Sequence, residues 1–237
     1  MKKLIPAICM TLIAAFMLAS STFAWFSMNT TVTANGMNVE AKSDSLFLAI
    51  QEGDSFNPAT ADITATSSKS TAQLLPIAHG TVEGGNGTPT AITVAADMTT
   101  PAKWFYAYSN SPTDHAQIAG KATVATTLTG YIASDTFTVG VHNNSGVSKA
   151  KELTITSVTI PANTGIAVVI VAGTTVFEYK ATNASATDVL LAGDFTTQTI
   201  TVYYYIDGTN PNVKTQNVAS LHGQVVITLS AKAAAAA

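Results

Sequence analysis

The chain has 237 residues and a formal net charge of -3, and 47% of its residues are hydrophobic whereas 11% are charged. This composition excludes an intrinsically disordered chain, because enough apolar surface is present to build a core. All 11 cations are lysine, and a chain without arginine and with a slight acidic excess lacks the clustered cations of a phosphate-binding surface. We therefore expect a folded protein with no nucleic-acid partner.

Residues 1–24 have the three parts of a secretory signal peptide. Two lysines follow Met1, an almost unbroken apolar run comes next, and Thr22 and Ala24 occupy the small-residue positions of a cleavage site. We predict a signal-peptide helix over this segment and cleavage between Ala24 and Trp25 by a signal peptidase.

The apolar run, residues 4–19, is short for a membrane span. As a helix it covers roughly 24 Å, less than the roughly 30 Å of a hydrocarbon core. We expect a secreted product, extracellular or at the cell surface, with no stable membrane insertion after cleavage. The alternative is a helix that continues through Phe26 and is retained as an anchor. Cleavage would also remove Cys9, the only cysteine, and with it all disulfide and thiol chemistry.

The rest of the chain has the pattern of β-strands. It is rich in threonine, with 37 residues in the whole sequence, paired with valine, isoleucine and tyrosine. About ten alternating segments separated by turn residues predict an all-β fold, a jelly-roll-like β-sandwich. The clearest alternation lies at residues 137–141, 153–160, 200–204 and 225–229, and further strands are predicted at 31–41, 45–51, 91–95, 103–108, 166–171 and 175–180.

The predicted domain organisation follows from these segments. After the signal peptide we expect an N-terminal strand that could be donated to a neighbour, a β-sandwich domain and a frayed tail, at residues 25–42, 43–232 and 233–237. Residues 57–70 hold mostly alanine, threonine and serine and predict an exposed loop. Few short helical turns are expected, near residues 70–75 and 114–119.

No catalytic motif accompanies these strands. The chain has no metal-ligand spacing, no nucleophile elbow and no phosphate-binding glycine loop. We predict that the protein is not an enzyme and has no cofactor or metal. A hydrolase with carboxylates brought together from distant strands is a minor alternative. The four histidines are scattered singly, and we expect surface or turn positions for His79, His115, His142 and His222.

One loop combines the oxygen ligands Asp207, Asn210 and Asn212. Such side chains could hold calcium, but the spacing differs from an EF-hand and Pro211 suits a plain turn, which is the favoured interpretation.

Two aromatic clusters suggest a possible binding surface, Trp104, Phe105, Tyr106 and Tyr108 in one and Tyr203, Tyr204 and Tyr205 in the other. Exposed rings on one sheet face would form a platform for carbohydrate. Because consecutive strand residues point to opposite faces, packing in the core is the favoured interpretation.

The junction STFAWFSMN at residues 21–29, followed by TANGMNVEA at 33–41, resembles the start of TasA/camelysin-type proteins, the SipW-dependent secreted matrix-fibre proteins of Gram-positive bacteria. The aromatic strand and Asp-Gly turn at residues 203–208, with the alternation at 225–229, fit the ending of similar exported proteins. The resemblance implies processing by a SipW-type signal peptidase, a jelly-roll domain and assembly into extracellular fibres by donor-strand complementation. Camelysin relatives have been classed as peptidases, but the chain has no metal motif to carry that activity.

The expected function is therefore a structural subunit of an extracellular filament or biofilm matrix, a homopolymer. A secreted carbohydrate-binding or adhesive β-sandwich module is the alternative. The expected donor strand alternates on either side of a bend at Asn35 and Gly36, although it could instead be the first strand of its own sandwich. Its candidate assembly residues are Trp25, Phe26, Val32, Ala34, Met37, Val39 and Ala41.

Overall fold

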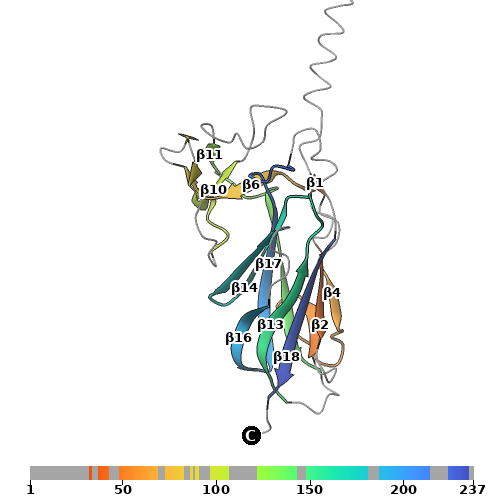
Figure 1. Cartoon of the computed structure of the whole chain (residues 1–237). Coiled ribbons are helices and arrows are strands. Elements are labelled where there is room, and N and C mark those ends of the chain that lie inside the picture. The colour runs from red at the N-terminus through yellow and green to blue at the C-terminus, as the bar shows by residue number, and fades with distance from the viewer. Residues whose placement is uncertain are drawn as a thin grey trace, which may run out of the picture. The chain divides into compact units, whose positions relative to one another are not determined.

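Strands dominate the described chain, and most of them belong to two sheets that pack face to face (Figure 1). A computed structural model describes residues 32–33, 37–42, 48–68, 73–82, 86–87, 89–90, 97–106, 122–142, 148–180, 187–213 and 224–234. These residues belong to one unit, Thr31–Ala237. The predicted all-β, sandwich-like fold is confirmed. The jelly-roll connectivity stays a prediction, and the signal-peptide helix over residues 1–24 lies outside the described residues.

The smaller sheet has five strands in the order β16-β13-β18-β2-β4 (Figure 1). Their bounds are Asp188–Phe195, Ala150–Thr159, Val225–Ala233, Met37–Lys42 and Thr64–Thr66. Neighbours are antiparallel except β18 and β2, which run parallel. The first long strand in the described chain therefore lies beside the last one.

The larger sheet has nine strands, with β17 near its centre. β17 pairs antiparallel with β14 on one side and with β12 on the other, and β12 pairs with β3. The end of β17 also pairs in parallel with β6, which continues the sheet through β10 and β11 to β8. The strands are β3 (Leu48–Glu52), β6 (Pro76–His79), β8 (Asn86–Gly87), β10 (Trp104–Tyr106), β11 (Ala122–Val124), β12 (Ile132–Val141), β14 (Ile166–Ala172), β15 (Thr175–Lys180) and β17 (Thr197–Asp207).

Two short ribbons complete the described strands, β1 (Val32–Thr33) with β5 (Gln73–Leu74), and β7 (Thr81–Val82) with β9 (Pro89–Thr90). The helical turn predicted near residues 70–75 is wrong, because Gln73 and Leu74 extend to pair with β1. A 3₁₀ turn forms instead at Pro101–Lys103, where proline at the first position suits a helix start. The other predicted turn, at 114–119, lies outside the described residues.

The main core fills the space between the two sheets. It receives alternate residues of β12, β14 and β17 from the larger sheet and apolar residues of β13, β18 and β2 from the smaller one. The fully buried members include Val39, Leu48, Phe137, Val139, Leu153, Ile155, Val168, Ile170, Ile200, Val202, Ile227 and Leu229.

A second, smaller core covers the outer face of the larger sheet. It includes Ala167 and Val169 of β14, Tyr205 of β17 and Trp104 of β10. Both faces of β14 are therefore covered, which explains why its sequence IAVVIVA is apolar at every position rather than alternating.

The predicted exposed loop at residues 57–70 is only partly correct. Thr64–Thr66 form β4, and Ala61, Ala65 and Ser67 are buried. Because the inward residues of β4 are small, no large apolar side chain marks this strand in the sequence. At the other end of the chain, β18 extends to Ala233, and the N–H of Ala234 donates to the Lys149 carbonyl at 2.9 Å.

Candidate functional site

The predicted assembly strand lies in the subunit's own smaller sheet. β2 pairs in parallel with β18 through six residue pairs, from Met37 with Val225 to Lys42 with Ser230. On its other side it pairs antiparallel with β4. Within this chain the segment therefore has the position of an internal strand, as in the alternative interpretation of the sequence.

Val39 is the residue of β2 that enters the main core, where its side chain is 0% exposed. Upstream, Val32 belongs to β1 and is paired with Leu74. Met37 and Ala41 also belong to β2, as predicted for a strand. The cleavage residues Thr22, Ala24 and Trp25, and the assembly residues Phe26 and Ala34, lie outside the described residues.

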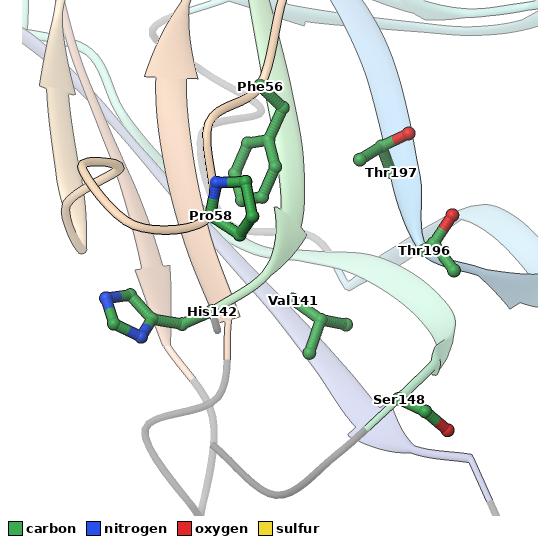
Figure 2. A pocket seen from close by; sticks show the side chains of 7 residues that line it. All are labelled: Phe56, Pro58, Val141, His142, Ser148, Thr196 and Thr197. Atoms are coloured by element: carbon green, nitrogen blue, oxygen red, sulfur yellow. The ribbon is translucent and has the colours of Figure 1, made fainter. Parts of the chain in front are cut away.

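A hollow of about 310 Å³ opens at the end of the sandwich where β12 finishes and β17 begins (Figure 2). Phe56 and Pro58 form one wall, and the Phe56 ring packs so closely on β12 that a Cβ added at Gly140 would lie 2.6 Å from it. The remaining lining residues are Val141, His142, Ser148, Thr196 and Thr197. His142 is the single histidine among these lining residues, and none of them is an aspartate or glutamate, so the hollow lacks the paired groups of general acid–base catalysis.

The two aromatic clusters lie largely in the cores. Trp104 and Tyr205 meet edge to face, with ring centroids 5.0 Å apart, and both are 0% exposed. Phe105 is also buried, and Tyr204 points into the main core from the opposite face of β17. These four rings are inaccessible to a carbohydrate, which agrees with the favoured core-packing interpretation.

Tyr106 and Tyr131 are the partly exposed aromatic pair, with ring centroids 4.8 Å apart and planes tilted by 34°. The Tyr106 hydroxyl oxygen accepts hydrogen bonds from the N–H groups of Thr126, at 3.0 Å, and Thr127, at 3.2 Å. These hydrogen bonds hold the loop after β11 against β10. Tyr108 lies outside the described residues.

The loop that could have held calcium is already occupied by protein groups. Asp207 Oδ2 pairs with Lys180 Nζ at 2.8 Å, and its Oδ1 accepts the N–H and hydroxyl of Thr209 at 2.9 and 2.6 Å. Asn210 Oδ1 accepts the N–H of Asn212 at 2.9 Å. The arrangement is that of a turn stabilised by its own side chains, as favoured from the sequence.

The Lys180–Asp207 pair belongs to a polar cluster that the sequence analysis missed. Glu178 lies 3.5 Å from the same Lys180 Nζ and accepts a short hydrogen bond from the Tyr205 hydroxyl. Burial raises the pKa of Tyr205 well above its usual value, and the neighbouring Glu178 carboxylate adds to this effect. One sequence feature indicates part of this cluster. Glu178 and Lys180 are two residues apart, as are Tyr205 and Asp207, and in a strand this spacing puts each pair on one face of the sheet.

A second carboxylate group lies at the end of β4. Asp135 Oδ2 accepts the Ser67 hydroxyl at 2.6 Å, and Glu52 accepts the N–H of Ser68 at 2.5 Å. Burial favours the neutral form of Asp135, but the hydrogen bonds that its carboxylate accepts, from the Ser67 hydroxyl and from the N–H of Thr136, outweigh this effect and lower its pKa. These contacts connect β4 of the smaller sheet to β3 and β12 of the larger one.

His79 does not have the surface or turn position expected for it. It is the last residue of strand β6, is half-buried, and its ring lies 4.7 Å from the buried Trp104 ring in an edge-to-face contact. His142 lines the hollow, whereas His115 and His222 lie outside the described residues. Among the described side chains, no three histidine, cysteine, aspartate or glutamate residues come together in a way that could hold a metal ion.

Comparisons with known proteins add no relative, since neither models of protein families nor the curated proteins give a match to this chain. The part of the chain that the structure describes holds no helix long and apolar enough to cross a membrane.

Proposed function

We propose that this protein is the structural subunit of an extracellular filament, and that its N-terminal strand is exchanged between neighbouring subunits after removal of the signal peptide. The main support for this proposal is the position of β2, which pairs with β18 through six residues and buries Val39 in the main core. A strand with this complement of hydrogen bonds and apolar contact can serve equally well in a neighbour's identical slot.

The connectivity supports exchange rather than a fixed internal strand. β2 precedes the long strands of the sandwich and is joined to β3 by residues 43–47. β1 and β2 can therefore leave together. β4 and β5 would lose their partners, whereas the pairings of β3 with β12, of β12 and β14 with β17, and of β13 with β16 and β18 would remain. Withdrawal would leave one edge of β18 unpaired, and such an edge is a template for another strand.

Exchange of this kind gives an open assembly. A subunit that gives its strand to one neighbour and receives a strand from another makes a head-to-tail contact, and such contacts produce filaments when the rotation does not close a ring. The signal peptide and the resemblance at residues 21–41 support the same proposal. The carbohydrate-binding alternative would need exposed rings. Trp104 and Tyr205 are buried, so it would depend on partly exposed rings such as Tyr106 and Tyr131.

The test is electron microscopy of the purified exported protein, with and without an excess of a synthetic peptide of residues 25–42. Filaments are expected without the peptide. The peptide should occupy the free β18 edge and shorten them, whereas a peptide of scrambled sequence should have no effect. The proposal would be overturned by protein that stays monomeric at high concentration, or by filaments whose length is the same with and without the peptide.

A further inference from the structure

We propose that Lys180 and Asp207 become joined by an intramolecular amide bond, an isopeptide cross-link between β15 and β17, and that Glu178 transfers the protons. The cross-link lies within one subunit, so it does not depend on the proposed filament.

The sheet brings the two reacting side chains together across an intervening strand. Ala167 of β14 is paired with Lys180 on one side and with Tyr205 on the other. Its small side chain leaves room for Lys180 to reach over β14, and Nζ lies 2.8 Å from Asp207 Oδ2. The amine nitrogen therefore lies next to the carboxyl group that it would attack, and this proximity corresponds to effective molarities of about 10⁵–10⁸ M in well-oriented systems.

The Asp207 carboxyl group is held in a way that suits acyl transfer. Its side chain is 8% exposed, so little water competes for it. Its second oxygen, Oδ1, accepts two hydrogen bonds from Thr209, from the N–H at 2.9 Å and from the hydroxyl at 2.6 Å. When nitrogen adds to Cγ, negative charge develops on this oxygen, and the two Thr209 donors would stabilise it.

Glu178 is placed to move the protons. One of its oxygens lies 3.5 Å from Lys180 Nζ, and the Tyr205 hydroxyl donates to the same carboxylate and fixes its orientation. Tyr205 is itself held by the Trp104 ring in the second core. Burial favours the neutral amine of Lys180, but the Asp207 and Glu178 carboxylates outweigh this and raise its pKa. The ammonium group must therefore lose a proton during the step, which requires a base close to it.

The reaction balances without any other reagent. The Lys180 ammonium gives a proton to Glu178, and the amine lone pair adds to Cγ of Asp207, forming a C–N bond. Glu178 passes its proton to Oδ2, a second proton from the nitrogen follows by the same route, and the Cγ–Oδ2 bond breaks to release water. One ammonium and one carboxylate become one amide and one water molecule, and Glu178 ends as it began.

The chain offers a matched control pair. Lys232 Nζ lies 2.6 Å from Glu152 Oε1, but these side chains are 64% and 39% exposed. No second carboxylate is paired with Lys232 among the described residues, and water competes freely at this site. An ion pair alone should therefore not form an amide here.

The experiment is intact mass spectrometry of the purified full-length mature protein, followed by protease digestion and fragment sequencing. We expect a mass below that of the sequence by one water molecule and a branched peptide that joins Lys180 to Asp207. Glu178→Gln should keep the full sequence mass while retaining a cooperative melt, because the amide oxygen can still accept from Tyr205. Lys180→Arg should also keep the full mass, and Lys232→Arg should still lose water.

One competing reaction has the same mass change. A succinimide at Asp207 and Gly208 would also release water, but the Gly208 nitrogen is engaged in a hydrogen bond to the Ile77 carbonyl at 3.0 Å. A linear peptide carrying the water loss, or water loss that survives Lys180→Arg, would assign the change to a succinimide and overturn the proposal. A folded wild-type protein with the full sequence mass would overturn it as well.

Discussion

Val39 of β2 lies beside Ile227 of β18 in a parallel pair, and neither side chain is exposed to solvent. Parallel neighbours cannot be joined by a short hairpin, so this contact joins two ends of the chain that are far apart in sequence. The N-terminal segment is thus connected to the sandwich by pairing and burial rather than by a tight turn. Strand exchange would rebuild this same contact between two subunits.

The first prediction concerns the energy of that contact. Val39→Ala should lower the free energy of unfolding by about 2 kcal/mol, because it removes apolar surface from a closely packed core. Val189→Ala is the matched control, since Val189 is 44% exposed on β16 and should change stability by less than about 0.5 kcal/mol. Urea unfolding of the non-assembled protein measures both, and equal effects would contradict the burial of Val39.

The second prediction uses two glycines with positive φ. Gly165 has φ +69° and an added Cβ would lie 2.1 Å from Val213 Cγ2, whereas Gly173 has φ +61° and no atom within 4 Å of such a Cβ. Gly173→Ala should cost about 1 kcal/mol from backbone strain alone. Gly165→Ala should cost roughly 2–4 kcal/mol, because overpacking is added to the same strain. Thermal melts that rank them in the opposite order would show that the loop after β17 packs differently.

The third prediction concerns acid. Asp135 has a lowered pKa in the folded protein, because the effect of burial is outweighed by hydrogen bonds from the Ser67 hydroxyl and the Thr136 N–H. Its contribution to stability should therefore be present above the unfolded value of about 3.9 and be lost as the pH falls through the lower folded value. Near neutral pH, Asp135→Asn should be less stable than wild type by about 1 kcal/mol. This difference should disappear in acid, and a difference that is constant down to the lowest pH of the titration would contradict the assignment.

The fourth prediction is that chelation has no effect on stability. Lys180 Nζ lies 2.8 Å from Asp207 Oδ2, so a calcium ion could bind this oxygen only by displacing the Lys180 ammonium group. The melting temperature should be unchanged by EDTA and by added calcium. A drop of several degrees with EDTA, reversed by calcium, would show that the loop binds a metal after all.

The main features of the fold could be predicted because alternation is a local signal. The buried residues Phe137, Val139, Ile200 and Val202 occupy the positions that period two assigns to one face. In β13 the pattern changes phase between Ile155 and Val158, and the structure has an irregularity of register there. β13 has a second irregularity of register at Glu152, where φ is 57°. The sequence does not indicate it, because the residue expected at a positive φ is glycine.

Other features depend on partners that the sequence does not identify. β16 was not predicted because its core-facing residues Leu190 and Phe195 do not keep a simple alternation. β4 lacks large apolar residues, and β6 and β11 are too short to show alternation, whereas β10 lies within the strand predicted at residues 103–108. The cluster of Lys180, Glu178 and Asp207 forms across an intervening strand, so it can be found only once the order β15-β14-β17 is known.

A cysteine pair across β2 and β18 distinguishes a strand that is exchanged between subunits from one that stays in its own subunit. Asn38 and Val226 are register partners, so Asn38→Cys with Val226→Cys, in a chain with Cys9→Ser, should form a disulfide wherever β2 occupies its slot. Val171→Cys with Val176→Cys is the control, because β14 and β15 form a hairpin within one chain in either arrangement. In material assembled outside the cell and run on a non-reducing gel, strand exchange predicts a ladder of covalent multimers for the first pair and a single monomer band for the second. A monomer band with a closed internal disulfide for both pairs would contradict exchange.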